Sequence, residues 1–137
     1  MKMIFEILEE VAKKRTKAEK ISFLQKNESW ALKDVIRGSV DSTIKFNLPE
    51  GRPPYTANRE ESAPTSLLRE NKKFGYFVKG GPGDDLPSYK RESIFLGILE
   101  GIHPKDAEVL VDMINKVTPK GLTRPIIEEA FPGLLKD

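Results

Sequence analysis

The sequence contains no cysteine and only one histidine, His103, among its 137 residues. These absences exclude disulfide bonds, thiolate metal sites, iron–sulfur clusters and cysteine nucleophiles, and one histidine cannot build a histidine-based metal site. No apolar run reaches the length of a membrane span or a signal peptide, because Glu6 interrupts the apolar start of the chain. We therefore expect a cytoplasmic protein with no membrane partner, metal ion or other cofactor.

Neither sign of charge is in clear excess. Twenty-three Lys and Arg residues face twenty-one Asp and Glu residues, which leaves a formal net charge of +2. This value is too small to indicate a polyanionic partner by itself, so such a partner must be argued from where the charges cluster. A chain of this length with 38% hydrophobic residues supports one modest core, and we expect a single domain over 1–137.

Apolar residues at helical spacing predict an all-α fold, a compact bundle of six or seven short helices. Thr16 and Ser29 are typical N-caps, Gly38 is the expected stop of the third helix, and Trp30 is expected in the core. In the second helix, Ala18, Ile21 and Leu24 form the expected buried face. The predicted helices cover about 2–14, 16–26, 29–38, 88–101, 104–116 and 123–131, with a short one near 65–71.

The segment from about 41 to 88 is expected to be long, irregular and rich in proline and glycine. Residues 49–87 hold six of the ten prolines and five of the ten glycines. Within this segment, 74–78 is either a brief extended piece or an aromatic plug. Its aromatic side chains serve either as anchors in the core or as stacking platforms for bases.

Basic residues cluster in three stretches of the sequence. The first surrounds the turn after the opening helix, where Lys13, Lys14, Arg15, Lys17 and Lys20 accompany a single acid, Glu19. Such a run is either a solvated turn or a contact for phosphates. The other two stretches are Lys72 with Lys73, beside Arg69 and Lys79, and the run Lys116, Lys120 and Arg124. A compensating acidic face is expected from Glu6, Glu9, Glu10, Glu128 and Glu129.

The turn before the last helix is the most specific candidate site. Lys120, Gly121 and Thr123 place a cation, backbone amides and a hydroxyl at a helix N-terminus, which favours anions. The alternative is an ordinary cap that follows a glycine turn.

No combination of residues indicates catalysis. The glycine-rich stretch 80–83 lacks the Lys-Ser/Thr pair of a P-loop. Asp84 and Asp85 supply too few oxygen ligands for a hard cation, and His103 precedes Pro104 as a residue of a helix cap. We expect no enzyme activity and no small-molecule substrate.

Two parts of the sequence carry a set of short strings that belong together. These are FEILEEVA at 5–12, TKAEK at 16–20, FLQKN at 23–27 and LKDV at 32–35, then ILEGI at 98–102, KDAEVL at 105–110 and IEEAFPGL at 127–134. In this order the strings resemble the N-terminal helical DNA-binding domain of T-even-phage ATP-dependent DNA ligases. About ninety residues are covered, and the middle from about 50 to 90 does not match.

The resemblance implies a stand-alone, phage-encoded module that binds duplex DNA and lacks the catalytic domain. The Lys-x-Asp-Gly adenylation motif of these ligases is missing from this sequence. We expect contacts to backbone phosphates with little sequence specificity and a preference for nicked or flexible sites. The expected contact residues are Lys14, Arg15, Lys17, Lys20, Lys72, Lys73, Lys116, Lys120, Gly121, Thr123 and Arg124. The alternative is a phage interaction protein that keeps the scaffold and binds a phage or host protein through the 50–90 loop.

Overall fold

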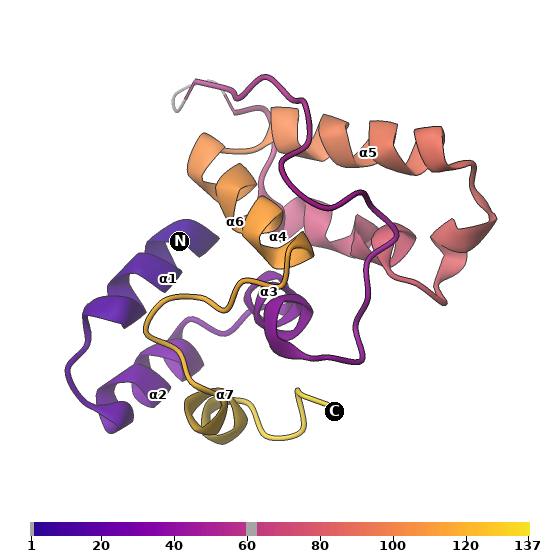
Figure 1. Cartoon of the computed structure of the whole chain (residues 1–137). Helices are drawn as coiled ribbons and strands as arrows, with labels where there is room; N and C mark the ends of the chain where they lie inside the picture. Colours follow the sequence, from indigo (N-terminus) through magenta and orange to yellow (C-terminus); the bar gives the residue numbers. More distant parts are fainter. Residues whose placement is uncertain (1, 60–62) are drawn as a thin grey trace.

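The computed structural model describes residues 2–59 and 63–137. Within them the chain forms seven α-helices and two short 3-10 helices, and its only strand-like pairing is an isolated bridge between Phe46 and Val78 (Figure 1). The all-α prediction is therefore confirmed. The bounds are α1 Ile4–Lys13, α2 Lys17–Lys26, α3 Trp30–Val40, α4 Leu67–Glu70, η2 Asn71–Phe77, η3 Pro82–Asp85, α5 Ser88–Gly101, α6 Pro104–Ile114 and α7 Arg124–Ala130.

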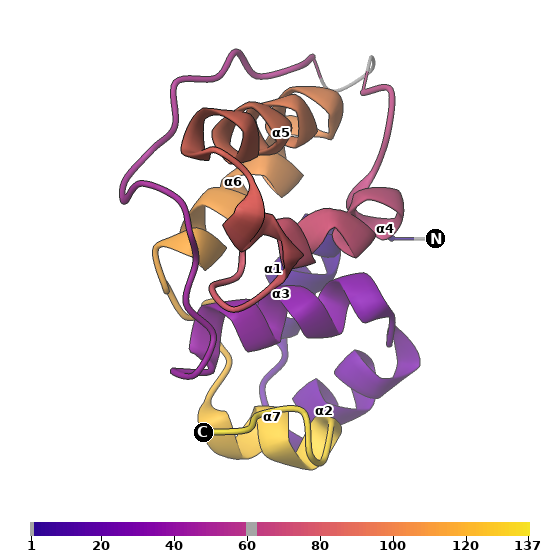
Figure 2. The same ribbon diagram turned by 90° about the vertical axis from the view of Figure 1, so that its right-hand side faces the viewer.

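The helices are stacked along one direction of the molecule. In both views, α2 and α7 lie side by side at one end, α5 lies at the other end, and α3 and α6 lie between them (Figure 1 and Figure 2). The segment after α3 runs along the outside toward α5. Each α-helix contributes a fully buried side chain to one core: Ile4, Leu24, Leu32, Leu67, Phe95, Leu110 and Ile127.

Helix α1 is amphipathic, as its spacing predicted. Ile4, Ile7 and Val11 are buried on one face. Asp106 in the first turn of α6 accepts a hydrogen bond from the backbone N–H of Phe5 at 2.8 Å. Burial raises the pKa of the Asp106 carboxyl. A hydrogen bond from the backbone of α1 to a side chain of α6, together with apolar packing, thus fixes α1 against α6.

Helix α3 continues past Gly38, so the predicted stop is wrong. Gly38 is buried, and a Cβ atom there would lie 2.9 Å from Met113 Sδ and 3.1 Å from Phe46 Cζ. Glycine at this position allows a close approach to α6 instead of ending the helix. The helix ends two residues later, at Val40.

The predicted N-caps of α2 and α3 are confirmed. Thr16 Oγ1 accepts from the N–H of Glu19, and Ser29 Oγ accepts from the N–H of Leu32, both at 3.1 Å. Each bond satisfies a donor in the first turn that has no partner within the helix. Thr123 occupies the N-cap position of α7, but its side chain makes no capping hydrogen bond.

Trp30 is 71% exposed, so its predicted place in the core is wrong. It is the first residue of α3, and the buried face of that helix begins at Ala31. The ammonium of Lys33 lies 4.9 Å from the centroid of the Trp30 ring and 5.6 Å from that of Phe131. The indole therefore lies on the surface with a cation against its ring.

Helix α2 buries less than its sequence predicted. Leu24 is buried, whereas Ile21 is half-buried and Ala18 is exposed. The helix packs against α7, where Gln25 Nε2 donates to the carbonyl of Ala130 at 3.2 Å. Contacts with the end of the chain therefore hold α2 in place.

The second half of the segment predicted as irregular is ordered into α4, η2 and η3. Phe74 and Phe77 are buried, and the Phe77 ring packs edge-to-face on Phe95 with 5.2 Å between centroids. Residues 71–77 are therefore an aromatic plug in a 3-10 helix, and the extended alternative is wrong. Tyr76 stays 39% exposed.

Two glycine substitutions test this packing. A Cβ atom at Gly83 would overlap the carbonyl of Tyr76, which belongs to rigid backbone. At Gly97, within α5, the Cβ atom would meet no atom within 4 Å. We expect Gly83→Ala to destabilise the protein by about 1–3 kcal/mol. We expect Gly97→Ala to stabilise it by about 0.5–1 kcal/mol, since alanine is the better helix former.

Urea unfolding followed by far-ultraviolet circular dichroism measures both changes. An unchanged unfolding midpoint for Gly83→Ala would contradict the close packing of η3 on η2.

Candidate nucleic-acid interface

A hydrogen bond joins two basic stretches that lie about a hundred residues apart in the sequence. Lys20 of α2 donates from Nζ to the carbonyl oxygen of Gly121 at 2.6 Å. Gly121 has φ +82, in the left-handed region that favours glycine, and a Cβ atom there would lie 2.8 Å from Ala12 Cα. The loop before α7 is therefore seated against the end of α1 and the side of α2.

This seating brings four cations together at one end of α1. Lys13 and Lys120 line the same groove between α1, α6 and the loop before α7. Lys14 and Arg15 follow Lys13 in the turn to α2, where the Lys14 ammonium lies 5.0 Å from the Phe23 ring centroid. We name Lys13, Lys14, Arg15 and Lys120 the turn patch. None of its side chains forms an ion pair with another described residue.

Two of the carboxylates close to the turn patch, Glu9 and Glu108, already have cationic partners. In the α1–α6 groove, Glu9 lies 3.9 Å from Lys105, and Glu108 lies 2.8 Å from Arg52. The hydrogen bond from Arg52 lowers the pKa of the Glu108 carboxyl. Asp112, which also lines this groove, has a pKa raised by burial. Asp112 and Glu19, which accepts from the backbone N–H of Arg15 at 3.4 Å, form no ion pair with a described residue, so two nearby carboxylates stay unpaired beside the patch.

Four of the five acids expected to form an acidic face, Glu9, Glu10, Glu128 and Glu129, form ion pairs with cations. Lys17 Nζ lies 3.3 Å from Glu129 Oε2, and both side chains are more than half exposed. Lys2 pairs with Glu10 at 3.3 Å. These acids are dispersed as partners of surface cations. Lys17 borders the turn patch and differs from it in having a carboxylate partner.

Arg124 faces the end of the chain. Its guanidinium contacts Asp137, and its Nε lies 3.4 Å from Glu128 Oε1. Hydrogen bonds from Ser42 and then the charge of Arg124 lower the pKa of the Asp137 carboxyl to about 2. Arg124 is thus paired at neutral pH, and we leave it out of the contact surface.

Lys116 has a structural environment. Its Nζ donates to the carbonyls of Gly38, Asp41 and Ile44 at 2.5, 2.8 and 2.9 Å. Burial lowers the pKa of this ammonium. Lys116 thereby satisfies carbonyl groups at the C-terminal end of α3 and in the turn that follows. Its ammonium is occupied, and we also leave it out of the contact surface.

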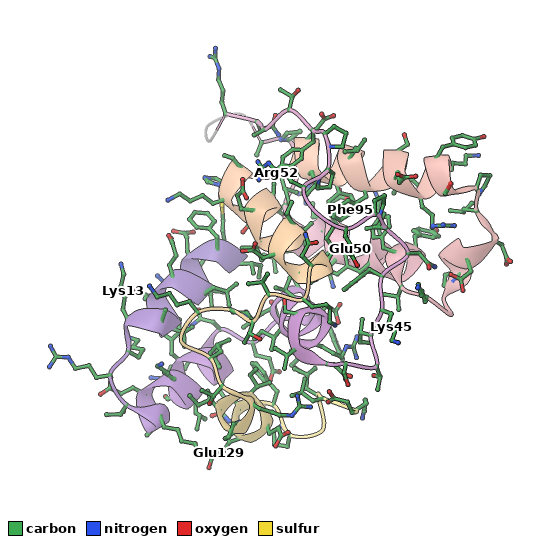
Figure 3. All side chains as sticks on the ribbon, viewed as in Figure 1. Lys13, Lys45, Glu50, Arg52, Phe95 and Glu129 are labelled. Atoms are coloured by element: carbon green, nitrogen blue, oxygen red, sulfur yellow. The ribbon has the colours of Figure 1, made fainter. Side chains whose placement is uncertain are left out.

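Lys72 and Lys73 belong to another part of the molecule. Lys73 pairs with Glu70 at 2.8 Å, and this hydrogen bond lowers the pKa of the Glu70 carboxyl. Lys72 is exposed and lines a different groove, next to α3. Figure 3 shows Lys13 and Lys45 on opposite sides of the molecule, and Lys45 belongs to the side of Lys72. The predicted contact residues therefore form two separate regions instead of one patch.

The sequence prediction did not include Lys45 in the candidate surface. Its neighbours Ile44 and Phe46 are partly buried, whereas Lys45 is exposed. This alternation is typical of an extended segment with one face inward. The alternation of apolar and charged residues at 44–46 could have predicted an exposed Lys45, although the proline and glycine content of the wider segment predicted irregular structure. Among the described residues no helix is long and apolar enough to cross a bilayer, and no group of three His, Asp or Glu could hold a metal ion.

Substitution of Lys116 separates a structural role from a role in binding. Lys116→Ala removes the donor to three carbonyls, and we expect a loss of about 1–2 kcal/mol in stability, since part of the site can be solvated. The matched control, Lys45→Ala, removes an exposed lysine and should stay within about 0.5 kcal/mol of the parent. Thermal unfolding measures both. Equal stability of the two variants would contradict the capping role.

These contacts define an all-helical protein in which a hydrogen bond between Lys20 and Gly121 holds a basic loop against a basic turn. Comparison with known protein families shows to which family the chain belongs. The model of a family described as a family of unknown function (DUF6433) matches residues 7–120, and the chain belongs to that family. The matched region begins within α1 and ends at Lys120, so it includes the whole turn patch. No curated protein sequence matches this chain.

Proposed function

We propose that this protein is a non-catalytic module that binds duplex DNA through backbone phosphates, with little sequence specificity and a preference for nicked or flexible sites. The supporting observation is the Lys20–Gly121 hydrogen bond, because it joins the basic turn after α1 to the loop that carries Lys120. Cations without carboxylate partners are the groups that phosphates attract most readily. The resemblance to the helical domain of T-even-phage ligases favours the same ligand.

The side chains of the turn patch are of the type that positions a protein on DNA through phosphate contacts. Its side chains are long and flexible, and Lys13, Arg15 and Lys120 are exposed. Lysine and arginine of this kind contact phosphates and carry no sequence information by themselves. The neighbouring backbone is fixed by Gly121 against Ala12, so the four charges keep a common location. Binding by such a surface should be similar for unrelated sequences.

Salt dependence gives the first quantitative expectation. If the four side chains of the turn patch each neutralise about one phosphate, the logarithm of the binding constant should fall with a slope of about −3 to −4 against the logarithm of salt concentration. Fluorescence anisotropy with a labelled duplex at several salt concentrations measures this slope. Lys13→Glu with Lys120→Glu should make the slope shallower by about 2 and weaken binding to every sequence alike.

The matched control is Arg69→Glu with Lys90→Glu, which reverses two exposed cations outside the turn patch. The control should bind duplex nearly as well as the parent protein. Equal weakening by the two double variants would show that only total charge matters. Duplex binding by Lys13→Glu with Lys120→Glu at the parent's strength would reject the turn patch as the contact surface.

A second candidate function is an adaptor that binds a phage or host protein, and the exposure of Trp30 favours it. Large aromatic side chains are enriched at the centres of protein interfaces. Trp30 is 71% exposed and has the Lys33 ammonium against its ring. On a monomer the indole ring of Trp30 is therefore an exposed apolar surface that a partner protein would cover.

Trp30 also provides the measurement, because it is the only tryptophan in the chain. A partner that covers Trp30 should shift its fluorescence to shorter wavelength, and Trp30→Ala should then weaken binding by at least about 2 kcal/mol. Tyr89→Ala, which removes another exposed aromatic residue, serves as the control. A partner captured from host lysate that binds Trp30→Ala as tightly as the parent would exclude this surface.

A further inference from the structure

A groove of about 460 Å³ lies between α3 and η2, apart from the turn patch. Its volume falls in the range of about 300–1,000 Å³ that is typical of ligand pockets. The groove is bounded by α3, by the segment that follows it and by residues 71–81. Its apolar floor consists of the half-buried Ile44, Phe46 and Val78, with the buried Phe74 and Met113 beneath them.

Positive charge dominates the rim of this groove. Lys72 and Lys79 line it, and neither forms an ion pair with a described residue. Among the described lining residues the one carboxylate is Asp34, which is 3.0 Å from Arg37 and accepts from Asn71 at 3.1 Å. Because Asp34 is already paired, the two lysines remain available to an anionic ligand.

Two glycines leave the backbone of the groove open. Cβ atoms placed at Gly75 and Gly80 would meet no atom within 4 Å. Gly80 has φ +89, a conformation that residues with side chains rarely adopt. A ligand can therefore approach the main chain on this side of the groove, where a side chain would otherwise stand.

The backbone of Lys45 adjoins the groove. The backbone N–H of Lys79 donates to the carbonyl of Lys45 at 2.7 Å, so the two residues are held side by side. Lys45 is exposed. Lys72 and Lys79 place two cations beside apolar lining residues that include the half-buried Phe46 and the buried Phe74. Such a combination of basic rim and aromatic floor is the usual architecture for binding a single strand of nucleic acid.

We propose that the α3–η2 groove binds one nucleotide of a single-stranded DNA segment, with the base on the apolar floor and the flanking phosphates at Lys72 and Lys79. The inference rests on the proposed function for its choice of DNA as the ligand. It uses a different surface, because Lys13 and Lys45 lie on opposite sides of the molecule (Figure 3). A flexible single strand can enter a groove of this size, whereas a duplex is too wide.

The test uses a fluorescently labelled oligothymidylate and a labelled blunt duplex, each titrated with the full-length chain. Lys72→Glu with Lys79→Glu reverses the rim, and Lys13→Glu with Lys120→Glu reverses the turn patch. Lys72→Ala with Lys79→Ala is a milder form of the first change. Circular dichroism and thermal unfolding verify that each variant keeps the fold, as expected for exposed side chains.

The rim reversal should weaken oligothymidylate binding about tenfold or more and leave duplex binding within about twofold of the parent. The alanine form should make the salt slope for the single strand shallower by about 1.4, as expected when two phosphate contacts are lost. The turn-patch variant should show the opposite pattern and lose duplex binding alone.

Two results would overturn the groove as a single-strand site: no binding of oligothymidylate by the parent protein, or equal binding by the parent and the rim reversal. Neither result depends on the duplex titration. A parent that binds the single strand through the rim but fails to bind duplex would reject the proposed function while the groove stands.

Discussion

The hydrogen bond from Lys20 to the carbonyl of Gly121 connects the parts of the molecule that charge alone would not bring together. It requires glycine at 121, since the backbone has φ +82 and a Cβ atom would lie 2.8 Å from Ala12 Cα. With the loop held there, α7 follows directly beside α2. The same contact fixes Lys120 next to the end of α1. The packing of the C-terminal end and the location of the turn patch therefore have one cause.

The cations of this protein fall into three groups that a net charge does not distinguish. Lys20, Lys116 and Arg91 donate to backbone carbonyls and hold loops against helices. A second group, including Lys17 and Arg124, pairs with carboxylates. The third group has no ion pair with a described residue. Because buried carbonyls at helix ends need donors, a small bundle with long loops uses some of its lysines for structure. Only the third group is available to a polyanion.

Local rules predicted the helices because each depends on a few neighbouring residues. Thr16 and Ser29 cap as expected, and the apolar spacing of α1 gave its buried face. Gly38 was misread because a glycine near the end of an apolar pattern looks like a stop, whereas Met113 and Phe46 make it a packing position. That information lies in residues far away along the chain.

The candidate site was also predictable only in part, because local sequence shows the basic stretches but not which of them meet in the fold. The turn after α1 and the loop before α7 stood out as basic stretches, yet nothing in the sequence states that a lysine in one meets a glycine in the other. Lys116 looked like its basic neighbours, and only the positions of three distant carbonyls identify its structural role. Trp30 shows the converse case, since one position along α3 decides between core and surface. Contacts with residues far away in the sequence therefore decide which lysine has a structural role and which aromatic residue is exposed.

A net charge of +2 is compatible with DNA binding because electrostatic fields in salt are local. At physiological ionic strength the screening length is about 8 Å, so a bound phosphate is affected mainly by the charges beside it. Glu108 and Asp34 lie near the two basic surfaces, but each is held by an arginine, Arg52 and Arg37. Such pairs keep the lysines next to them from being neutralised. The pairing of Glu108 and Asp34, more than a surplus of bases, thus limits how far nearby acids neutralise the two regions.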